Sequence, residues 1–363
     1  MRTLGCDQRS VLQPSELTIA LVPPPSAASR AAAAERLAAL ATPPGALGQL
    51  GDLGVWASAV QGAVPPRDFA NVRLVIFAGD HGVAEHGVSA FPPEITGAMV
   101  RTFLAGRAGV NALAQSHRVS VRVLDLGCRE DFNDLPVSVR EPLAAHKVRR
   151  SSRPLHLTDA LTPDESEDAF AAGQTVAREE IAAGADLLIS GDMGIGNTTA
   201  AAALVAHLLG LPAAEVVGRG TGVDEDGLAR KTAAVDAATA RVRSCDLAGI
   251  PAMGALSSAD LVATTGYLVA AARAGVPVLL DGLMSVACAL WADALAPGAS
   301  AWFAAGHRST EPAQSLALDK LALTPLLDLG MRLGEGSGAV AAVPVLRSAV
   351  ALLRDVALLT ELG

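Results

Sequence analysis

The sequence predicts an α/β protein with a doubly wound, mostly parallel β-sheet and a second, smaller helical domain. Two observations predict this fold class. Short apolar or β-branched runs alternate with helical stretches through the middle of the chain, and the chain from residue 314 on has helical periodicity without a good strand. Strands that alternate with helices of this length form parallel β-α-β units, in which helices cover the sheet.

The individual elements follow from these patterns. The expected strands are 72–77, 119–126, 185–190, 276–280 and 301–304. The helices expected between them include 198–209, 226–243, 258–274 and 284–295. A further helix is expected to begin at Thr162-Pro163-Asp164-Glu165, which has the spacing of a capping box.

The two ends of the chain differ from its middle. Residues 1–25, which close with Pro23-Pro24-Pro25, are expected to form a loose N-terminal arm. Ser26 is a suitable N-cap for an alanine-rich helix that ends before Thr42-Pro43. We therefore expect a large α/β domain over 65–312 and a small helical domain built from 26–64 together with 313–363.

Composition narrows the classes of function. The net charge is −9, whereas nonspecific nucleic-acid binding requires a basic surface. A small phosphate-bearing ligand fits better, because a local pocket can be positive on an acidic protein. No run has the apolar character of a membrane span or a secretory signal, so we expect a cytoplasmic protein. The four cysteines lack the paired spacing of zinc or redox sites.

The most informative segment joins the expected strand 185–190 to the helix 198–209. Glycines at 191, 194 and 196 predict a tight turn, and Asn197 and Thr198 open the helix. Free backbone N–H groups and the helix dipole would make a phosphate site there, although a plain strand-to-helix turn gives the same pattern.

Two further loops carry polar or charged residues. Gly218-Arg219-Gly220-Thr221-Gly222 precedes a helix with Lys231, and both bases could serve a phosphate or could be solvated. Segment 77–89 follows a strand and contains Asp80, His81, Glu85 and His86. Their spacing matches no metal motif, so we expect no metal site and interpret them as ordinary loop polarity.

A single carboxylate, Glu335, stands in Gly334-Glu335-Gly336-Ser337-Gly338, before an apolar helix. A carboxylate among small residues beside apolar surface would have a raised pKa, which suits a general base near neutral pH. The alternative is a carboxylate that only complements the helix dipole.

Together these segments resemble the nicotinate-nucleotide–dimethylbenzimidazole phosphoribosyltransferase family over about residues 42–353. The most specific stretches are Gly79-Asp-His-Gly-Val83, Gly194-Ile-Gly-Asn-Thr-Thr199, Gly218-Arg-Gly-Thr-Gly222 and Gly330-Met-Arg-Leu-Gly-Glu-Gly-Ser-Gly338. The resemblance implies a Rossmann-like large domain, a small helical domain from both chain ends, and a homodimer. It also implies that an aromatic base displaces nicotinate from nicotinate mononucleotide, with no cofactor or metal required.

The resemblance implies roles for particular residues. Glu335 would be the general base. The donor nucleotide would be held by Asp192, Gly194, Gly196, Asn197, Thr198, Lys231, Gly282, Ser309 and Thr310. The acceptor base would lie among Asp80, His81, Phe91, Met99, Met331 and Leu333.

The sequence departs from the family's pattern at three places. Asp192 stands where Glu is usual, the segment 254–260 lacks the expected Gly-Gly and Glu, and Pro92-Pro93 stands where many members have Pro-Gln. Two alternatives therefore stay open: a relative that accepts other bases, such as adenine or phenols, and a weakly active paralogue that binds the nucleotide.

Overall fold

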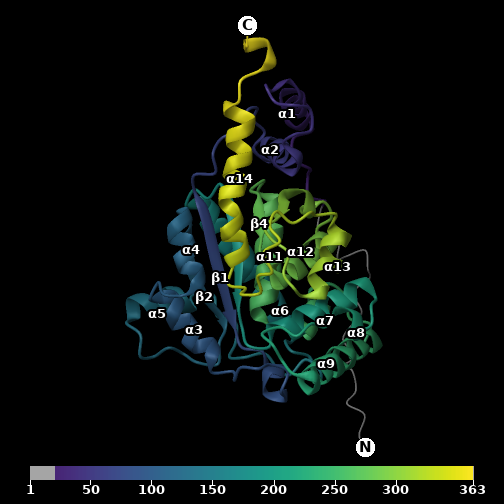
Figure 1. The fold of residues 1–363 in the computed structure, drawn as a ribbon. Coiled ribbons are helices and arrows are strands. Elements are labelled where there is room, and N and C mark those ends of the chain that lie inside the picture. Colours follow the sequence, from purple (N-terminus) through teal and green to yellow (C-terminus); the bar gives the residue numbers. More distant parts are fainter. Residues whose placement is uncertain (1–20, 363) are drawn as a thin grey trace, which may run out of the picture.

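The computed structural model describes residues 21–362 and contains a five-stranded, all-parallel sheet (Figure 1). The strands are β1 (Val72–Gly79), β2 (Ser120–Gly127), β3 (Leu187–Met193), β4 (Val278–Leu280) and β5 (Phe303–Ala305). Their order across the sheet is β2-β1-β3-β4-β5. The five strands expected from the sequence are therefore confirmed, but β3 continues through Gly191 and Asp192, so the turn after it begins at Gly194 and not at Gly191.

Helices cover both faces of the sheet. They are α1 (Ala27–Ala39), α2 (Gly48–Gln61), α3 (Ile95–Leu104), α4 (Gly109–His117), α5 (Val137–Ala144), α6 (Pro163–Ala182), α7 (Asn197–Leu209), α8 (Ala213–Val216), α9 (Glu225–Ser244), α10 (Gly249–Leu256), α11 (Ala259–Arg273), α12 (Leu283–Leu295), α13 (Pro312–Leu321) and α14 (Ser337–Asp355). Figure 1 shows α14 in front of the sheet and α11 behind it. α6 and α12 pack on α11, while α4 packs on α14.

The order of the strands places a ligand crevice. β1 pairs with β2 on one side and with β3 on the other, so the chain winds in opposite directions from this point. In open α/β sheets, ligands bind beyond the carboxyl ends of the strands where the winding reverses. The loops after β1 and β3 are therefore expected to form a site.

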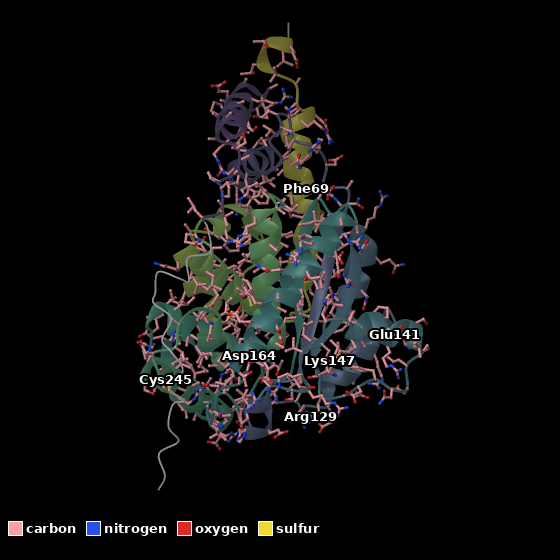
Figure 2. All side chains as sticks on the ribbon, turned by 180° about the vertical axis from the view of Figure 1, so that it is seen from behind. Phe69, Arg129, Glu141, Lys147, Asp164 and Cys245 are labelled. Carbon is pink, nitrogen blue, oxygen red and sulfur yellow. The ribbon has the colours of Figure 1, made fainter. Side chains whose placement is uncertain are left out.

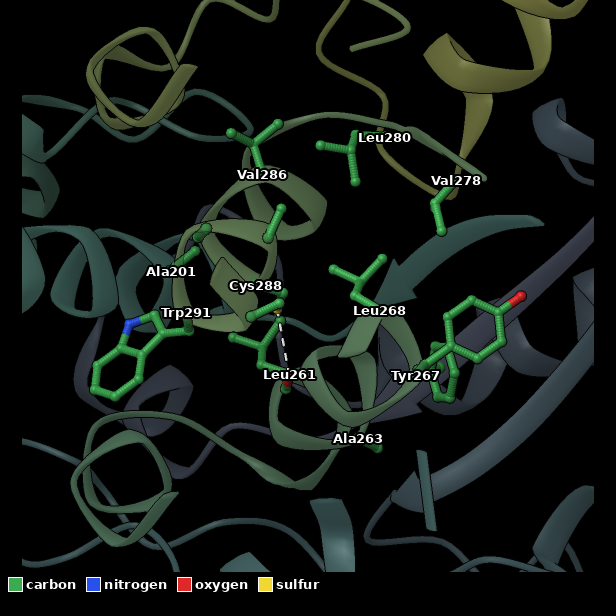
Figure 3. Close-up of a cluster of buried hydrophobic side chains, with 14 of the residues drawn as sticks. Ala201, Leu261, Ala263, Tyr267, Leu268, Val278, Leu280, Val286, Cys288 and Trp291 are labelled. Atoms are coloured by element: carbon green, nitrogen blue, oxygen red, sulfur yellow. Dashed lines mark hydrogen bonds between the residues drawn. The ribbon is translucent and has the colours of Figure 1, made fainter. Parts of the chain in front are cut away.

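The core is built from small side chains in close contact. α6 and α11 approach so closely that a Cβ on Gly173 would lie 1.7 Å from the carbonyl oxygen of Ala263. A Cβ on Gly266 would lie 2.1 Å from the carbonyl oxygen of Phe170. Figure 3 shows the neighbouring apolar cluster, where the thiol of Cys288 donates to the carbonyl of Leu261. Close backbone packing compensates for an aromatic content of only 3%.

Both chain ends contribute to a helical cluster at one end of the sheet. α2 packs on α1 and on α14, around a small core of Ala33, Leu40, Val55 and Leu353. α13, by contrast, packs on α12, α7 and α8 beside the sheet. We propose the two-domain division on the contacts of α1, α2 and α14, with α13 on the side of the large domain.

The expected N-terminal arm lies mostly outside the described residues. Its last part is fixed: Val22 is buried, its N–H donates to Pro297 O, and the carbonyl of Pro23 accepts from Trp302 Nε1. The expected N-cap of α1 is present, since Ser26 Oγ accepts from the N–H of Ser29.

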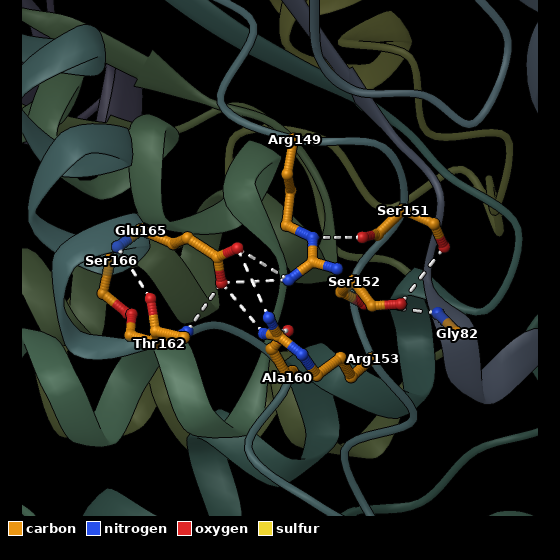
Figure 4. Close-up of polar contacts among 9 residues, drawn as sticks. All are labelled: Gly82, Arg149, Ser151, Ser152, Arg153, Ala160, Thr162, Glu165 and Ser166. Atoms are coloured by element: carbon orange, nitrogen blue, oxygen red, sulfur yellow. Dashed lines mark hydrogen bonds and ion pairs between the residues drawn. The ribbon is translucent and has the colours of Figure 1, made fainter.

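Polar contacts fix the connector before α6. The capping box is confirmed, because Thr162 and Glu165 each accept from the other's backbone N–H. Glu165 also pairs with Arg149 and Arg153 (Figure 4). Figure 2 shows that most charged side chains, such as Arg129 and Glu141, lie on the periphery. One helix of the described chain, α14, could cross a membrane by length and composition, and it packs on α2, α4 and β3.

Candidate active site

A cavity of about 380 Å³ lies beyond the carboxyl ends of β1, β3, β4 and β5. It is the crevice that the strand order predicts. The lining includes these residues named from the sequence: Asp192, Gly194, Gly196, Asn197, Thr198, Arg219, Lys231, Gly282, Ser309, Phe91, Met99, Leu333 and Glu335. Segments up to about 250 residues apart in sequence thus share one site.

The turn after β3 presents backbone donors to the cavity. Gly196 has φ +93°, a left-handed conformation that favours glycine, and α7 begins at the next residue. The N–H groups of Asn197 and Thr199 donate to the carbonyls of Gly194 and Gly196. No residue between 21 and 362 accepts from the N–H of Thr198, so this helix-start donor is left for a phosphate. Asn197 Nδ2 donates to Asp192 Oδ1 at 2.6 Å and fixes the start of the turn.

Asp192 lies in a buried carboxyl pair. Burial raises the pKa of Asp192 well above its ordinary value, and the charge of Asp260 raises it further. Burial also disfavours the Asp260 carboxylate, but His81, together with hydrogen bonds from Ser258 and Asp192, holds the pKa of Asp260 below its ordinary value. His81 Nε2 lies 3.0 Å from Asp260 Oδ2. Of the two carboxyl groups, Asp192 is therefore the one that holds a proton more readily.

Lys231 supplies a buried cation at the same end of the cavity. Its Nζ donates to Thr198 Oγ1 at 3.0 Å and to the carbonyl of Gly218 at 2.8 Å. Burial lowers the pKa of Lys231, and the charge of Glu311 opposes that shift. The alternative interpretation, in which Lys231 is solvated, is wrong because its side chain is buried. Arg219, by contrast, is half-exposed and pairs with Glu225 at the rim of the cavity.

Glu335 is held at the cavity by contacts that distort its backbone. Its φ is +67°. Its carbonyl oxygen packs directly against the backbone of Gly191, since a Cβ on that glycine would lie only 2.4 Å from this oxygen. The N–H of Val110, in the first turn of α4, donates to Glu335 Oε2 at 3.2 Å. Burial raises the pKa of Glu335; the Val110 bond opposes this, and the charge of Asp281 adds to it. A raised pKa is what a general base near neutral pH requires.

Asp281, at the end of β4, anchors the loop that carries Glu335. Its Oδ2 accepts from the N–H of Gly336 at 3.1 Å, and its Oδ1 accepts from Gly338 at 2.7 Å and Ala339 at 3.1 Å. These three N–H groups belong to the start of α14, so Asp281 caps that helix from another element. The cap fixes the position of Glu335 relative to the sheet.

The apolar part of the cavity lining is called the apolar end below. It consists of Val88, Phe91, Ile95, Met99, Leu283, Met284 and Leu333. A flat apolar wall beside one carboxylate suits a neutral aromatic ring that carries an N–H donor.

Four residues named from the sequence do not line the cavity. Thr310 is exposed, and Met331 lies two residues before Leu333, which does line the cavity. Asp80 is buried and accepts from the N–H of Arg129. His81 lies behind the turn at Gly194, where a Cβ would approach its ring to 2.7 Å. His81 thus packs against the turn, and the hydrogen bonds of Asp80 and His81 lead into the protein.

Three functional candidates were missed from the sequence. His307 and Glu311 line the cavity, and Asp281 anchors the Glu335 loop. Each follows a strand by one to six residues, which is a signal that could have found them. Among residues 21–362, no group of three or more His, Cys, Asp and Glu side chains is arranged to hold a metal ion.

Comparison with known proteins agrees with this geometry. The sequence model of a family described as phosphoribosyltransferase matches residues 22–363. Nicotinate-nucleotide–dimethylbenzimidazole phosphoribosyltransferase of Mycolicibacterium paratuberculosis is 51% identical over 347 residues, which cover 96% of this chain and 98% of the relative. The enzyme of the same name from Mycobacterium tuberculosis is 52% identical over 339 residues, which cover 93% of this chain and 92% of the relative.

A solved structure gives the same result. The crystal structure of CobT from Thermus thermophilus matches with a TM-score of 0.86 at 44% identity, and the match covers 92% of this chain and 98% of that one. The sequence motifs, the fold and the comparisons agree, and the chain belongs to the nicotinate-nucleotide–dimethylbenzimidazole phosphoribosyltransferase family.

Proposed function

We propose that this protein transfers ribose 5-phosphate from nicotinate mononucleotide to dimethylbenzimidazole, giving α-ribazole phosphate and nicotinate for the lower ligand of cobalamin. The observation that carries the proposal is the position of Glu335. It is a buried carboxylate of raised pKa at a cavity with amide and ammonium donors at one end and an apolar wall at the other.

The donor nucleotide would occupy the polar end. Its phosphate would accept from the N–H of Thr198 at the start of α7, from Lys231 and from Ser309. Lys231 already donates to two oxygens, and its ammonium has a third N–H for the anion. The raised pKa of Asp192 favours its neutral form, which would not repel the nucleotide.

The acceptor base would occupy the apolar end, against Phe91, Met99 and Leu333. One ring nitrogen would attack the anomeric carbon of the ribose while Glu335 accepts the proton of the other ring nitrogen. The bond from the anomeric carbon to the pyridinium nitrogen would break with inversion, and its electron pair would return to the ring. Nicotinate would leave as a neutral pyridine ring with its carboxylate, so the bond that breaks needs no protonation.

Product analysis tests the proposal. Purified protein would be mixed with nicotinate mononucleotide and dimethylbenzimidazole, benzimidazole, adenine or phenol, and followed by chromatography and mass spectrometry. We expect fastest ribotide formation with dimethylbenzimidazole and one nicotinate released per ribotide. Faster reaction with another base would change the identity of the acceptor and leave the proposed mechanism unchanged. Nucleotide binding without any ribotide would favour the weakly active paralogue.

We also propose a cytoplasmic homodimer. This proposal rests on family membership. Light scattering of the purified protein would check the oligomeric state, for which we expect twice the mass of the 36.7 kDa chain.

A further inference from the structure

Glu311 has no role in the mechanism above, although it lies in the cavity wall. It directly precedes α13 and is more than nine-tenths buried. Its Oε1 accepts from the N–H of Gly220 at 2.8 Å, which ties the glycine loop 218–222 to the end of the sheet. Burying a carboxylate is costly unless its oxygens are hydrogen-bonded.

The second oxygen of this carboxylate lacks a donor. Oε2 accepts no hydrogen bond from any residue between 21 and 362. It lies against the backbone of Gly218, where a Cβ would come within 2.4 Å of it. Because the side chain lines the cavity, the free acceptor is available to a molecule bound there.

The neighbours of Glu311 restrict what this molecule can offer. Gly220 lies between Glu311 and the ammonium of Lys231, since a Cβ on Gly220 would lie 3.2 Å from Lys231 Nζ. An anion is favoured on the Lys231 side of this glycine and repelled on the Glu311 side. The bound molecule must therefore place a hydrogen-bond donor beside Glu311, and it must carry this donor only a few covalent bonds from an anionic group.

This inference rests on the proposed function, in which the bound molecule is nicotinate mononucleotide. The phosphate and the carboxylate of that nucleotide only accept hydrogen bonds at neutral pH, whereas its two ribose hydroxyls donate. We propose that Glu311 accepts a hydrogen bond from a ribose hydroxyl of the donor and thereby selects ribonucleotides over deoxyribonucleotides. Through Gly220, the same side chain also fixes the distance between the sugar and phosphate subsites.

Binding of three donors to the wild-type protein and two variants tests this role. The donors are nicotinate mononucleotide and its 2′-deoxy and 3′-deoxy forms, with affinities from calorimetry. We expect the wild-type protein to bind one deoxy form roughly 10–100-fold more weakly, the usual value of a hydrogen bond to a charged group. In Glu311→Ala that ratio should fall to about threefold or less, because the acceptor is gone.

Glu311→Gln separates the hydroxyl contact from the loop anchor. Its amide oxygen can still accept from Gly220, while its NH₂ group replaces the free acceptor. We expect roughly tenfold weaker binding of the ribose donor and nearly unchanged binding of the deoxy donor. Asp319→Asn, which removes an exposed carboxylate from the same helix, is the matched control and should bind all three donors as the wild-type protein does.

Two results would overturn the role of Glu311 but not the proposed function. In the first, Glu311→Ala would still bind the deoxy form roughly 10–100-fold more weakly than nicotinate mononucleotide. In the second, Glu311→Gln would bind all three nucleotides more weakly by the same factor. Failure of the wild-type protein to bind nicotinate mononucleotide would instead overturn the proposed function as well.

Discussion

The two ends of the cavity differ in how they are built. At the polar end Lys231, Asp192 and Glu311 are 1%, 7% and 7% exposed, and hydrogen bonds hold each of them in place without a substrate. At the apolar end Phe91 and Leu333 are 48% and 54% exposed. The polar end is thus held in place by its own hydrogen bonds, whereas Phe91 and Leu333 at the apolar end would bury their exposed surface only against a bound ring.

The difference teaches where each kind of selectivity originates. Fixed donors and acceptors reject a ligand that lacks the matching group, because buried polar atoms would be left unpaired. Apolar burial is not directional and is roughly proportional to area. We therefore expect strict recognition of the donor nucleotide and tolerance among flat acceptor bases of similar size.

Glu335 lies between the two ends, and its replacement should have the largest effect. Glu335→Gln keeps the size of the side chain but removes the proton acceptor. The turnover number should fall by roughly 10²–10⁴, the usual contribution of a general base, with little change in either Michaelis constant. Steady-state kinetics would measure this, and a rate near that of the wild-type protein would remove Glu335 from the role.

Asp281→Asn should disturb the same carboxylate indirectly. The amide cannot accept from all three N–H groups of Gly336, Gly338 and Ala339, so the turnover number should fall by roughly 10–100-fold through misplacement of Glu335. Glu335 acts deprotonated, and the charge of Asp281 raises its pKa. Removal of that charge should move the acidic limb of the pH profile of kcat to lower pH. If the turnover number fell while the acidic limb of the pH profile stayed at the same pH, Asp281 would have a purely structural role.

Lys231→Ala tests the polar end alone. Loss of a buried cation that binds phosphate should raise the Michaelis constant for nicotinate mononucleotide by roughly 10–100-fold. The Michaelis constant for the base should stay within about threefold. An unchanged Michaelis constant for nicotinate mononucleotide would contradict the assignment of its phosphate to the polar end of the cavity.

Leu333→Ala tests the apolar end. The lost contact area should raise the Michaelis constant for the base by roughly 3–10-fold, since each buried CH₂ contributes about 0.8 kcal/mol. The constant for the nucleotide should not change. If both constants rose together, the two ends could not be treated as separate.

Asp192→Asn should have the smallest effect on turnover, because the protonated carboxyl and the amide are alike in size and charge. We expect a change of about threefold or less at pH 7. Stability should differ more: the raised pKa of Asp192 costs the wild-type protein folding free energy as pH rises above the unfolded value, and the amide lacks this cost. Calorimetry should give the variant a higher Tm at pH 7.5 and little difference at pH 4.

Local patterns predicted much of this site, and long-range contacts explain the rest. The strands, the turn at Gly194 and the positions of Lys231 and Glu335 follow from hydrophobic periodicity and glycine spacing. The place of Asp281 directly after β4 could have marked it as a candidate, but its role as an anchor could not be predicted, because its partners lie 55 to 58 residues away. Thr310 and Met331 do not line the cavity, because a motif identifies a loop without fixing which of its side chains face inward.

The helix α14 gives the loop of Glu335 a mechanical connection. It begins two residues after Glu335 and extends about 28 Å, at 1.5 Å per residue, to the helices at the chain ends. There the guanidinium of Arg36 donates to the carbonyls of Leu353 and Arg354. α14 thus links α1 to the loop of Glu335, and Pro344, which has no backbone N–H, is the place where the helix can bend. The reaction rate is therefore expected to respond to motions of helices that contact neither substrate.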